Sequence, residues 1–357
     1  MTITYHAGRR IQGLDADRTA IQLPSGSVGG WVELGRTTLG SNGDNIDVSS
    51  LPDKRYYMVL ANTTSSGLNR HGLRYNSDTG SNYAWRYSAN GANGAVTSNG
   101  RIIIQADNTA TDEFSVTYIA NKSDKEKLSY SQDVKQIATG ATTAPARMET
   151  VGKHAQTSNP ISTITLFNSE SGDYASGSEC VVLGWDPDDT HTNNFWEELA
   201  SVDLSGGASD TISSGTFTAK KYLWIQCFTG NTGGATRASL RVGNTTIDTG
   251  NNYAYRRSTN GAGDALFTST NRIHASSGAV ADTEFTNVFI INNASNEKLA
   301  ITHDVRRSTA GAGNAPTRDE TVGKWTNTSN QINIVEFFND QAGDFGTNTI
   351  LKVWGAD

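Results

Sequence analysis

The sequence predicts an all-β protein made of two tandem homologous β-sandwich domains, jelly-roll-like, with an extended N-terminal arm. The first reason is composition: the 357 residues include 36 Gly, only 6 Pro and only 18% charged residues. Gly and the abundant Asn adopt the positive φ angles that hairpin turns need. The second reason is that the stretch 80–91 returns, hardly altered, 170 residues later at 250–261. A chain of this length can bury two separate cores.

The matching segments around the two copies follow one another in the same order, which indicates an internal repeat of one unit. We assign residues 28–186 to the first jelly-roll repeat, 196–357 to the second, 187–195 to a linker and 1–27 to an N-terminal arm. The offset between repeats drifts from 165 to 171, which predicts insertions in the first half of the unit only. The linker is short and polar, so we expect docked domains.

The first half of each repeat opens with two runs of strand-forming residues, at 31–39 and 54–61 and again at 196–200 and 220–227. A strand at 73–75 or 240–242 follows. Asn90-Gly91 and Asn260-Gly261 then predict tight hairpins in both copies.

The second half of each repeat keeps a constant offset of 171 residues. Its matching segments are 113–119 and 284–290, 145–153 and 316–324, 161–168 and 332–339, and closing strands that end at Asp186 and Asp357. Nine or ten strands per repeat, separated by turn residues, favour a sandwich or barrel. We prefer a jelly roll, because an immunoglobulin-like sandwich is shorter and a lipocalin-like barrel needs fewer irregular loops.

Charge and cysteine content exclude several classes of protein. The net charge of −7 argues against nucleic-acid binding, which uses a basic surface. The sequence contains no apolar run of 18 residues, which would predict membrane insertion. The first ten residues also lack the apolar segment of a secretory signal. Cys180 and Cys227 lie in apolar runs of different repeats, so we expect two buried thiols rather than a disulfide or metal framework.

The repeated stretch is the main candidate binding site. Strand alternation places Asn82 and Arg86 on one face and Tyr83 and Trp85 on the other. The polar set is kept in the second copy while the aromatic set changes. Two interpretations stay open: an internal network that holds loop carbonyls or carboxylates, which we expect to lie within each domain, or a ligand surface for sugars. The candidate ligand-binding residues are Asn82, Tyr83, Trp85, Arg86, Asn252, Tyr253, Tyr255 and Arg256.

Two further groups of charged residues stand out in the sequence. Arg147, Glu149 and Lys153 alternate along one strand, as do Arg318, Glu320 and Lys324, which predicts charge ladders on exposed sheet surfaces. Asp186, Asp188 and Asp189 could hold Ca²⁺ but lack the spacing of a known loop. Nucleotide and hydrolase motifs are absent, and the six histidines are scattered. We therefore expect no enzyme, no cofactor, no catalytic residue and no metal site.

The segment 172–185, with its Gly-Ser followed by apolar residues and Leu-Gly, resembles the final strand of jelly-roll domains in virion proteins of tailed bacteriophages and related viruses. The phrases at 80–88 and 311–324 are similar to those of such structural proteins. The second copy departs at 346–349. The resemblance covers both repeats and implies a capsid, decoration, fibre or tail component, without catalytic residues.

The resulting hypothesis is a phage-like virion structural protein that assembles on the particle surface with copies of itself and with other virion proteins. A double-jelly-roll major capsid protein and a carbohydrate-binding adhesin for host-surface glycans are the alternatives. The arm carries apolar residues that a solvated tail would not need, so we expect it to lie along a neighbouring subunit. Its predicted assembly contacts are Ile3, Tyr5, Ile11 and Leu14.

Overall fold

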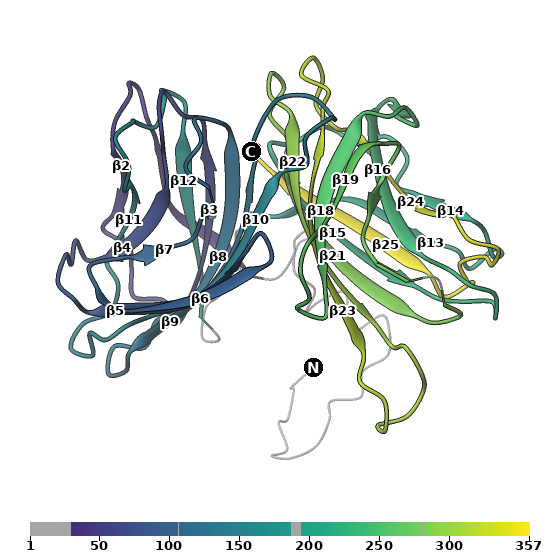
Figure 1. Cartoon of the computed structure of the whole chain (residues 1–357), viewed down its shortest axis with the longest axis horizontal. Coiled ribbons are helices and arrows are strands. Elements are labelled where there is room, and N and C mark those ends of the chain that lie inside the picture. The colour runs from purple at the N-terminus through teal and green to yellow at the C-terminus, as the bar shows by residue number, and fades with distance from the viewer. Residues whose placement is uncertain (1–29, 106, 187–193, 279) are drawn as a thin grey trace, which may run out of the picture.

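The computed structural model describes residues 30–105, 107–186, 194–278 and 280–357, and Figure 1 shows the two domains side by side. The described residues form strands and loops without any helix, so none of them forms a helix that could span a membrane. The predicted all-β class is confirmed. The predicted contacts of the arm (Ile3, Tyr5, Ile11 and Leu14) lie outside the described residues, as do Asp188 and Asp189.

Domain 1 contains twelve strands in two antiparallel sheets. The larger sheet has the order β1-β12-β3-β8-β9-β10-β5-β6, and the smaller has the order β2-β11-β4-β7. The strands are β1 (Val32–Thr38), β2 (Asn45–Ser49), β3 (Tyr56–Thr63), β4 (His71–Tyr75), β5 (Tyr83–Ala89), β6 (Ala92–Asn99), β7 (Ile102–Ile103), β8 (Glu113–Ala120), β9 (Lys127–Lys135), β10 (Ala146–His154), β11 (Thr163–Asn168) and β12 (Glu179–Trp185).

Domain 2 repeats this topology. Its larger sheet has the order β13-β25-β15-β21-β22-β23-β18-β19, and its smaller sheet the order β14-β24-β16-β17, with β20 also paired to β16. The strands are β13 (Glu197–Asp203), β14 (Thr211–Ser213), β15 (Tyr222–Thr229), β16 (Ala238–Asn244), β17 (Thr246–Ile247), β18 (Tyr253–Thr259), β19 (Ala265–Thr270), β20 (Ile273–His274), β21 (Glu284–Ile291), β22 (Lys298–Arg306), β23 (Thr317–Trp325), β24 (Ile334–Asn339) and β25 (Ile350–Ala356).

The strand order is that of a jelly roll with one addition. Eight strands of domain 1 pair as β1-β12-β3-β8 and β2-β11-β4-β7, the two four-stranded sheets of a double Greek key. The hairpins β5–β6 and β9–β10 extend the first sheet beyond β8. Asn90 has the positive φ of 49° that the predicted turn requires, and Asn260 has 53° at the same place in domain 2.

Each domain has its own core between its two sheets. In β3 the side chains of Tyr57, Val59 and Ala61 point into the core of domain 1, as strand alternation requires. Their neighbours Met58 and Leu60 point to the opposite face and are buried as well, in a third apolar cluster. Cys180 and Cys227 are free and buried in the two domain cores, as predicted.

The third apolar cluster lies between the domains. The outer faces of the two larger sheets pack against each other, with β8, β9 and β10 against β22 and β23. Domain 1 supplies Phe114, Val116 and Val134 among others, and domain 2 supplies a larger aromatic and aliphatic set. That set is Trp196, Tyr222, Phe289, Ile291, Leu299, Ile301, Val322, Trp354 and Ala356. The two jelly rolls are therefore joined by a buried interface of their own.

Candidate functional site

The aromatic residues of the repeated stretch are structural. Tyr83 and Trp85 are buried in the core of domain 1, as Tyr253 and Tyr255 are in domain 2. The Tyr83 hydroxyl accepts a hydrogen bond from the backbone N–H of Tyr75 at 3.0 Å, and the Tyr253 hydroxyl does the same for Val242 at 3.1 Å. None of the four presents its ring face to solvent for a sugar.

Asn82 and Asn252 belong to a turn that both domains build in the same way. Asn82 Nδ2 donates to Asp78 Oδ2 at 2.8 Å, and the backbone N–H of Gly80 donates to Asp78 Oδ1 at 2.7 Å. His154 Nε2 lies 2.8 Å from Asp78 Oδ2. We call this group the aspartate clasp of domain 1. It ties the start of β5 to the end of β10.

Domain 2 has the same clasp with one exchange. Asn252 and the backbone N–H of Gly250 donate to Asp248, and Trp325 Nε1 donates to Asp248 Oδ2 at 2.7 Å, where domain 1 has His154. The imidazole of His154 and the indole of Trp325 thus place a ring nitrogen at the same position beside the aspartate. The repeated Asn is explained by this internal network, which lies within each domain as predicted.

The two arginines of the stretch differ from each other, and here the prediction of hydrogen bonds within each domain is wrong. Arg256 is buried, and its Nε donates to the backbone carbonyl of Pro145 in domain 1 at 2.9 Å. Arg86 is exposed, and its side chain makes no hydrogen bond or ion pair with the described part of the chain. The sequence could not show the contact of Arg256 with Pro145, because Pro145 is 111 positions away in the other repeat.

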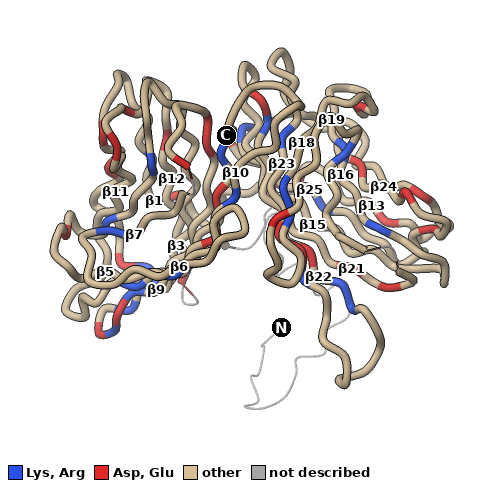
Figure 2. Tube along the Cα trace, in the orientation of Figure 1, with Lys and Arg blue, Asp and Glu red and all other residues tan. Residues whose placement is uncertain are grey.

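The charge ladders predicted to be exposed are largely buried between the domains, which corrects that expectation. Arg147 is 1% exposed and pairs across the interface with Asp264 at 2.8 Å and with Glu320 at 3.2 Å. Lys324 is fully buried and pairs with Glu297 at 3.0 Å. Only Lys153 and Arg318 lie at the surface, and Figure 2 shows the charges gathered where β10 and β23 approach.

Two carboxylates in this cluster come from equivalent positions of the two domains. Glu149 lies 3.0 Å from His303 Nε2 across the interface. Burial, together with the negative charge of Glu149, raises the pKa of Glu320 to about 7. The pKa of Glu149 is lowered, because hydrogen bonding and the charge of His303 outweigh its burial. Glu320 is therefore the member of the pair that holds a proton near neutral pH.

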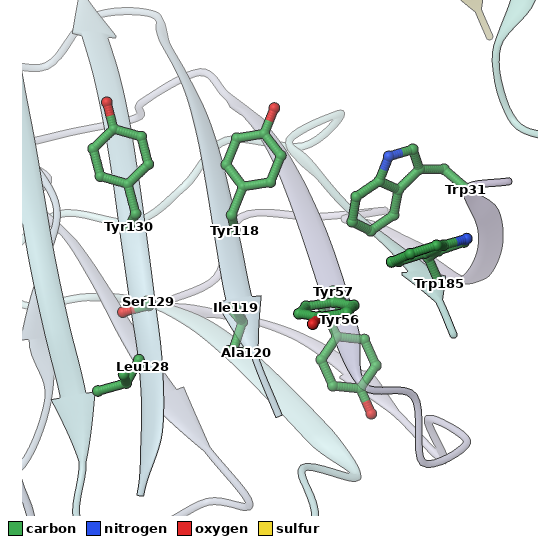
Figure 3. Close-up of a pocket in the computed structure, with 10 residues that line it drawn as sticks. All are labelled: Trp31, Tyr56, Tyr57, Tyr118, Ile119, Ala120, Leu128, Ser129, Tyr130 and Trp185. Carbon is green, nitrogen blue, oxygen red and sulfur yellow. The ribbon is translucent and has the colours of Figure 1, made fainter. Parts of the chain in front are cut away.

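A hollow of about 450 Å³ lies on the outer face of the larger sheet of domain 1 (Figure 3). The rings of Tyr56 and Trp185 stack at a centroid distance of 5.4 Å, and Trp31 meets Tyr118 edge to face at 6.4 Å. Tyr118 and Tyr130 lie opposite each other on β8 and β9. The remaining wall is formed by Leu128 and other small or apolar residues, so the hollow favours an apolar partner.

One buried group in domain 1 has the composition of a metal site: His71, Glu113 and Asp133. Lys135 already supplies a positive charge there, with its Nζ 3.3 Å from Glu113 Oε2. Domain 2 places Glu284, Asp304 and Arg306 at the equivalent positions, with a cation again beside the acids. Burial raises the pKa of Asp133 well above its ordinary value, and the nearby Glu113 adds to this. These contacts favour a core charge network over an ion site.

The fold and the interface define a class: proteins of two tandem jelly rolls joined face to face. No protein-family model and no curated protein matches the sequence. Solved structures with some similarity include domains LG4–5 of the mouse laminin α1 chain, with 8% identity over 98% of this chain and 93% of that chain and a TM-score of 0.20.

Two viral proteins are also among the solved structures. The mavirus major capsid protein shares 8% identity over 99% of this chain and 93% of that chain, with a TM-score of 0.15. A turret protein of Sulfolobus turreted icosahedral virus shares 11% identity over 87% of this chain and 97% of that chain, with a TM-score of 0.14. At such TM-scores the fold assignment depends on the strand order, and no function follows from these similarities.

Proposed function

We propose that the chain is a structural subunit of a virus particle, phage-like, which assembles on the particle surface as a capsid, decoration or fibre component. The observation that carries the proposal is the buried interface between the two jelly rolls, which joins them into one building block. Such a block offers several sheet faces in fixed directions, as a subunit of a symmetric assembly requires. The proposal assigns no reaction to the chain.

The experiment is to raise antibodies against the purified chain and apply them, with gold labels, to virus particles from the source. Labelling at regular positions on the particle, together with peptides of the chain in the mass spectrum of washed particles, is the expected result. A chain that is absent from particles would contradict the proposal. The positions of the labels would separate a shell protein, including the double-jelly-roll major capsid alternative, from a decoration or fibre component.

Glycan binding is the second candidate, and the stacked rings of Tyr56 and Trp185 are the observation that favours it. The residues first expected to form the ligand surface do not support it, because Tyr83, Trp85, Tyr253 and Tyr255 are buried. A glycan array with the parent chain and Trp185→Ala separates the candidates. Binding that the substitution abolishes would favour an adhesin, and we expect no binding above background.

A further inference from the structure

The interface between the domains joins two different surfaces of one fold. Domain 1 contributes the end of its larger sheet that carries Phe114 and Val134. Domain 2 contributes the opposite end of the equivalent sheet, with Tyr222, Leu299 and Val322. Because both domains have the same topology, each of them also has the counterpart of the surface that the other one uses. The part of these counterpart surfaces farthest from the interface is exposed, while Trp31, Tyr118 and Leu183 already contribute to the cluster between the domains.

The unused surface of domain 1 is apolar and exposed. We call it the free face of domain 1; it comprises Tyr56, Leu128 and Val151, beside the hollow of Figure 3. The residues at the equivalent strand positions of domain 2 are Tyr222, Leu299 and Val322. Leu128 is 56% exposed, whereas Leu299 is 1% exposed.

The unused surface of domain 2, its free face, is a continuous apolar row across four strands. Ile350 pairs with Phe228, Phe228 with Phe285, and Phe285 with Val305. Val305 is 43% exposed, whereas its counterpart Val134 is fully buried. Nine large apolar side chains are exposed in the described residues, and seven of them lie on the two free faces. The seven are Tyr56, Leu128, Val151, Phe228, Phe285, Val305 and Ile350.

One polar contact of the interface has counterparts of the same residue types in both domains. Arg256 donates to the carbonyl of Pro145, and Arg86 and Pro316 are the counterparts of these two residues. Arg86 is exposed and unpaired within the described residues, and it stands beside the free face of domain 1, lining a hollow with Leu128 and Val151. The repeated arginine thus has a partner in one domain and none in the other.

A second polar pair supports the same match. Glu297 accepts a hydrogen bond from Gln136 Nε2 at 2.6 Å and pairs with Lys324. Its counterpart Glu126 is exposed and pairs with Lys153 at 3.0 Å, in the same arrangement. The residue in domain 2 that corresponds to Gln136 is Arg307, a half-exposed cation that pairs with Asp282 and whose charge is opposite to that of Glu126. At this position the charges on the two free faces are therefore complementary.

We propose that the free face of domain 2 binds the free face of domain 1 of a second copy of this chain, so that chains associate head to tail through a contact that repeats the interface between the domains. The second copy is favoured over other occupants because each free face corresponds to a surface that already has its matching partner inside the chain. A heterologous contact of this kind forms a ring when its rotation closes and a filament when it does not. The inference rests on the proposed function for its biological role.

The test uses the full chain and two variants, Leu128→Asp and Val305→Asp, which place a carboxylate on one free face each. We expect the parent to form species heavier than one chain as its concentration rises in analytical ultracentrifugation. We expect each variant alone to form none of these species. An equimolar mixture of the two variants should form complexes of two chains and nothing larger, because each variant retains the face that the other lacks.

Leu68→Asp is the control, since Leu68 is 47% exposed and lies on neither free face. We expect Leu68→Asp to assemble like the parent, and we expect the melting temperatures of all variants to lie within a few degrees of that of the parent. A parent that stays a single chain at every concentration would overturn the proposal. So would loss of assembly in Leu128→Asp with normal assembly in Val305→Asp, because the free face of domain 1 would then receive residues 1–29, a glycan or another protein.

A matched pair of arginine substitutions gives a second readout that does not depend on added charge. We expect Arg86→Ala to weaken assembly without changing the melting temperature, and we expect Arg256→Ala to lower the melting temperature. Equal effects of the two on melting would contradict the proposal. Self-association by these faces in a chain that is absent from virus particles would leave the inference standing and remove the proposed function.

Discussion

At the residue scale, the stretch that the chain repeats most faithfully is explained by two separate demands. The aspartate clasps of Asp78 and Asp248 require the Asn and Gly of the turn, and the cores require the tyrosines. The arginine is kept for a different reason, a contact between domains that only Arg256 makes within the chain. Strand alternation predicted correctly which side chains point inward, but an outward side chain can meet water or another domain with the same sequence pattern.

The clasp makes a prediction about stability. Asp78→Ala removes the acceptor for Asn82, Gly80 and His154, and we expect a loss of about 1–3 kcal/mol in the free energy of unfolding. Asp248→Ala should have a similar effect in domain 2, because it removes the acceptor for Trp325. Urea unfolding of both variants measures this. An Asp78→Ala chain as stable as the parent would show that the clasp does not hold β5 to β10.

The buried carboxyl pair makes a prediction about pH. The pKa of Glu320 is about 7 in the folded chain and 4.5 when unperturbed, so the folded state holds its proton more tightly than the unfolded state does. Stability from this group is complete below pH 4.5 and is lost as the pH rises through 7. Glu320→Gln should therefore show a smaller fall in melting temperature between pH 5 and pH 8 than the parent, measured with Glu198→Gln as the exposed control.

At the element scale, the larger sheet of each domain carries two functions on its two faces. Its inner face closes the jelly roll, and its outer face forms the interface between the domains. The sequence predicted the order of matching segments, because turns and apolar runs are local signals. The predicted nine or ten strands per repeat were too few, since the domains have twelve and thirteen strands, and two-residue strands such as β7, β17 and β20 leave no periodic pattern. The sequence also predicted docked domains, but not which surfaces form the interface. The available signal was that outward positions such as Phe114 and Phe285, or Leu128 and Leu299, are apolar in both copies, which an exposed sheet would not require.

Counterpart strands give the sharpest test at this scale. Leu299 of β22 is buried between the domains, so Leu299→Ala should cost about 2–5 kcal/mol by loss of buried contacts and cavity formation. The same substitution at Leu128 of β9, which is exposed, should stay within about 0.5 kcal/mol for the single chain. Both are measured by urea unfolding at low protein concentration. Equal losses would mean that the two positions do not differ in burial as described.

At the scale of the whole molecule, two jelly rolls of one design are held in a contact that uses opposite ends of their larger sheets. Several features of that contact, among them Leu299 and Arg256, therefore have counterparts, Leu128 and Arg86, that are exposed in the described chain. This asymmetry connects the duplicated sequence, the exposed apolar rows and the unpaired Arg86 in one explanation. It also makes the two ends of the proposed virion subunit different, with the free face of domain 1 at one end and the free face of domain 2, which binds it, at the other.

The most direct measurement is a cryo-electron microscopy structure of the chain in its associated form. The account predicts that domain 2 of one copy contacts domain 1 of the next with the geometry that relates the two domains within a chain. Arg86 should then donate to the Pro316 carbonyl of its neighbour, and the free face of domain 2 should cover Leu128. A structure in which chains meet through any other surface, leaving Leu128 and Val305 in solvent, would contradict the account.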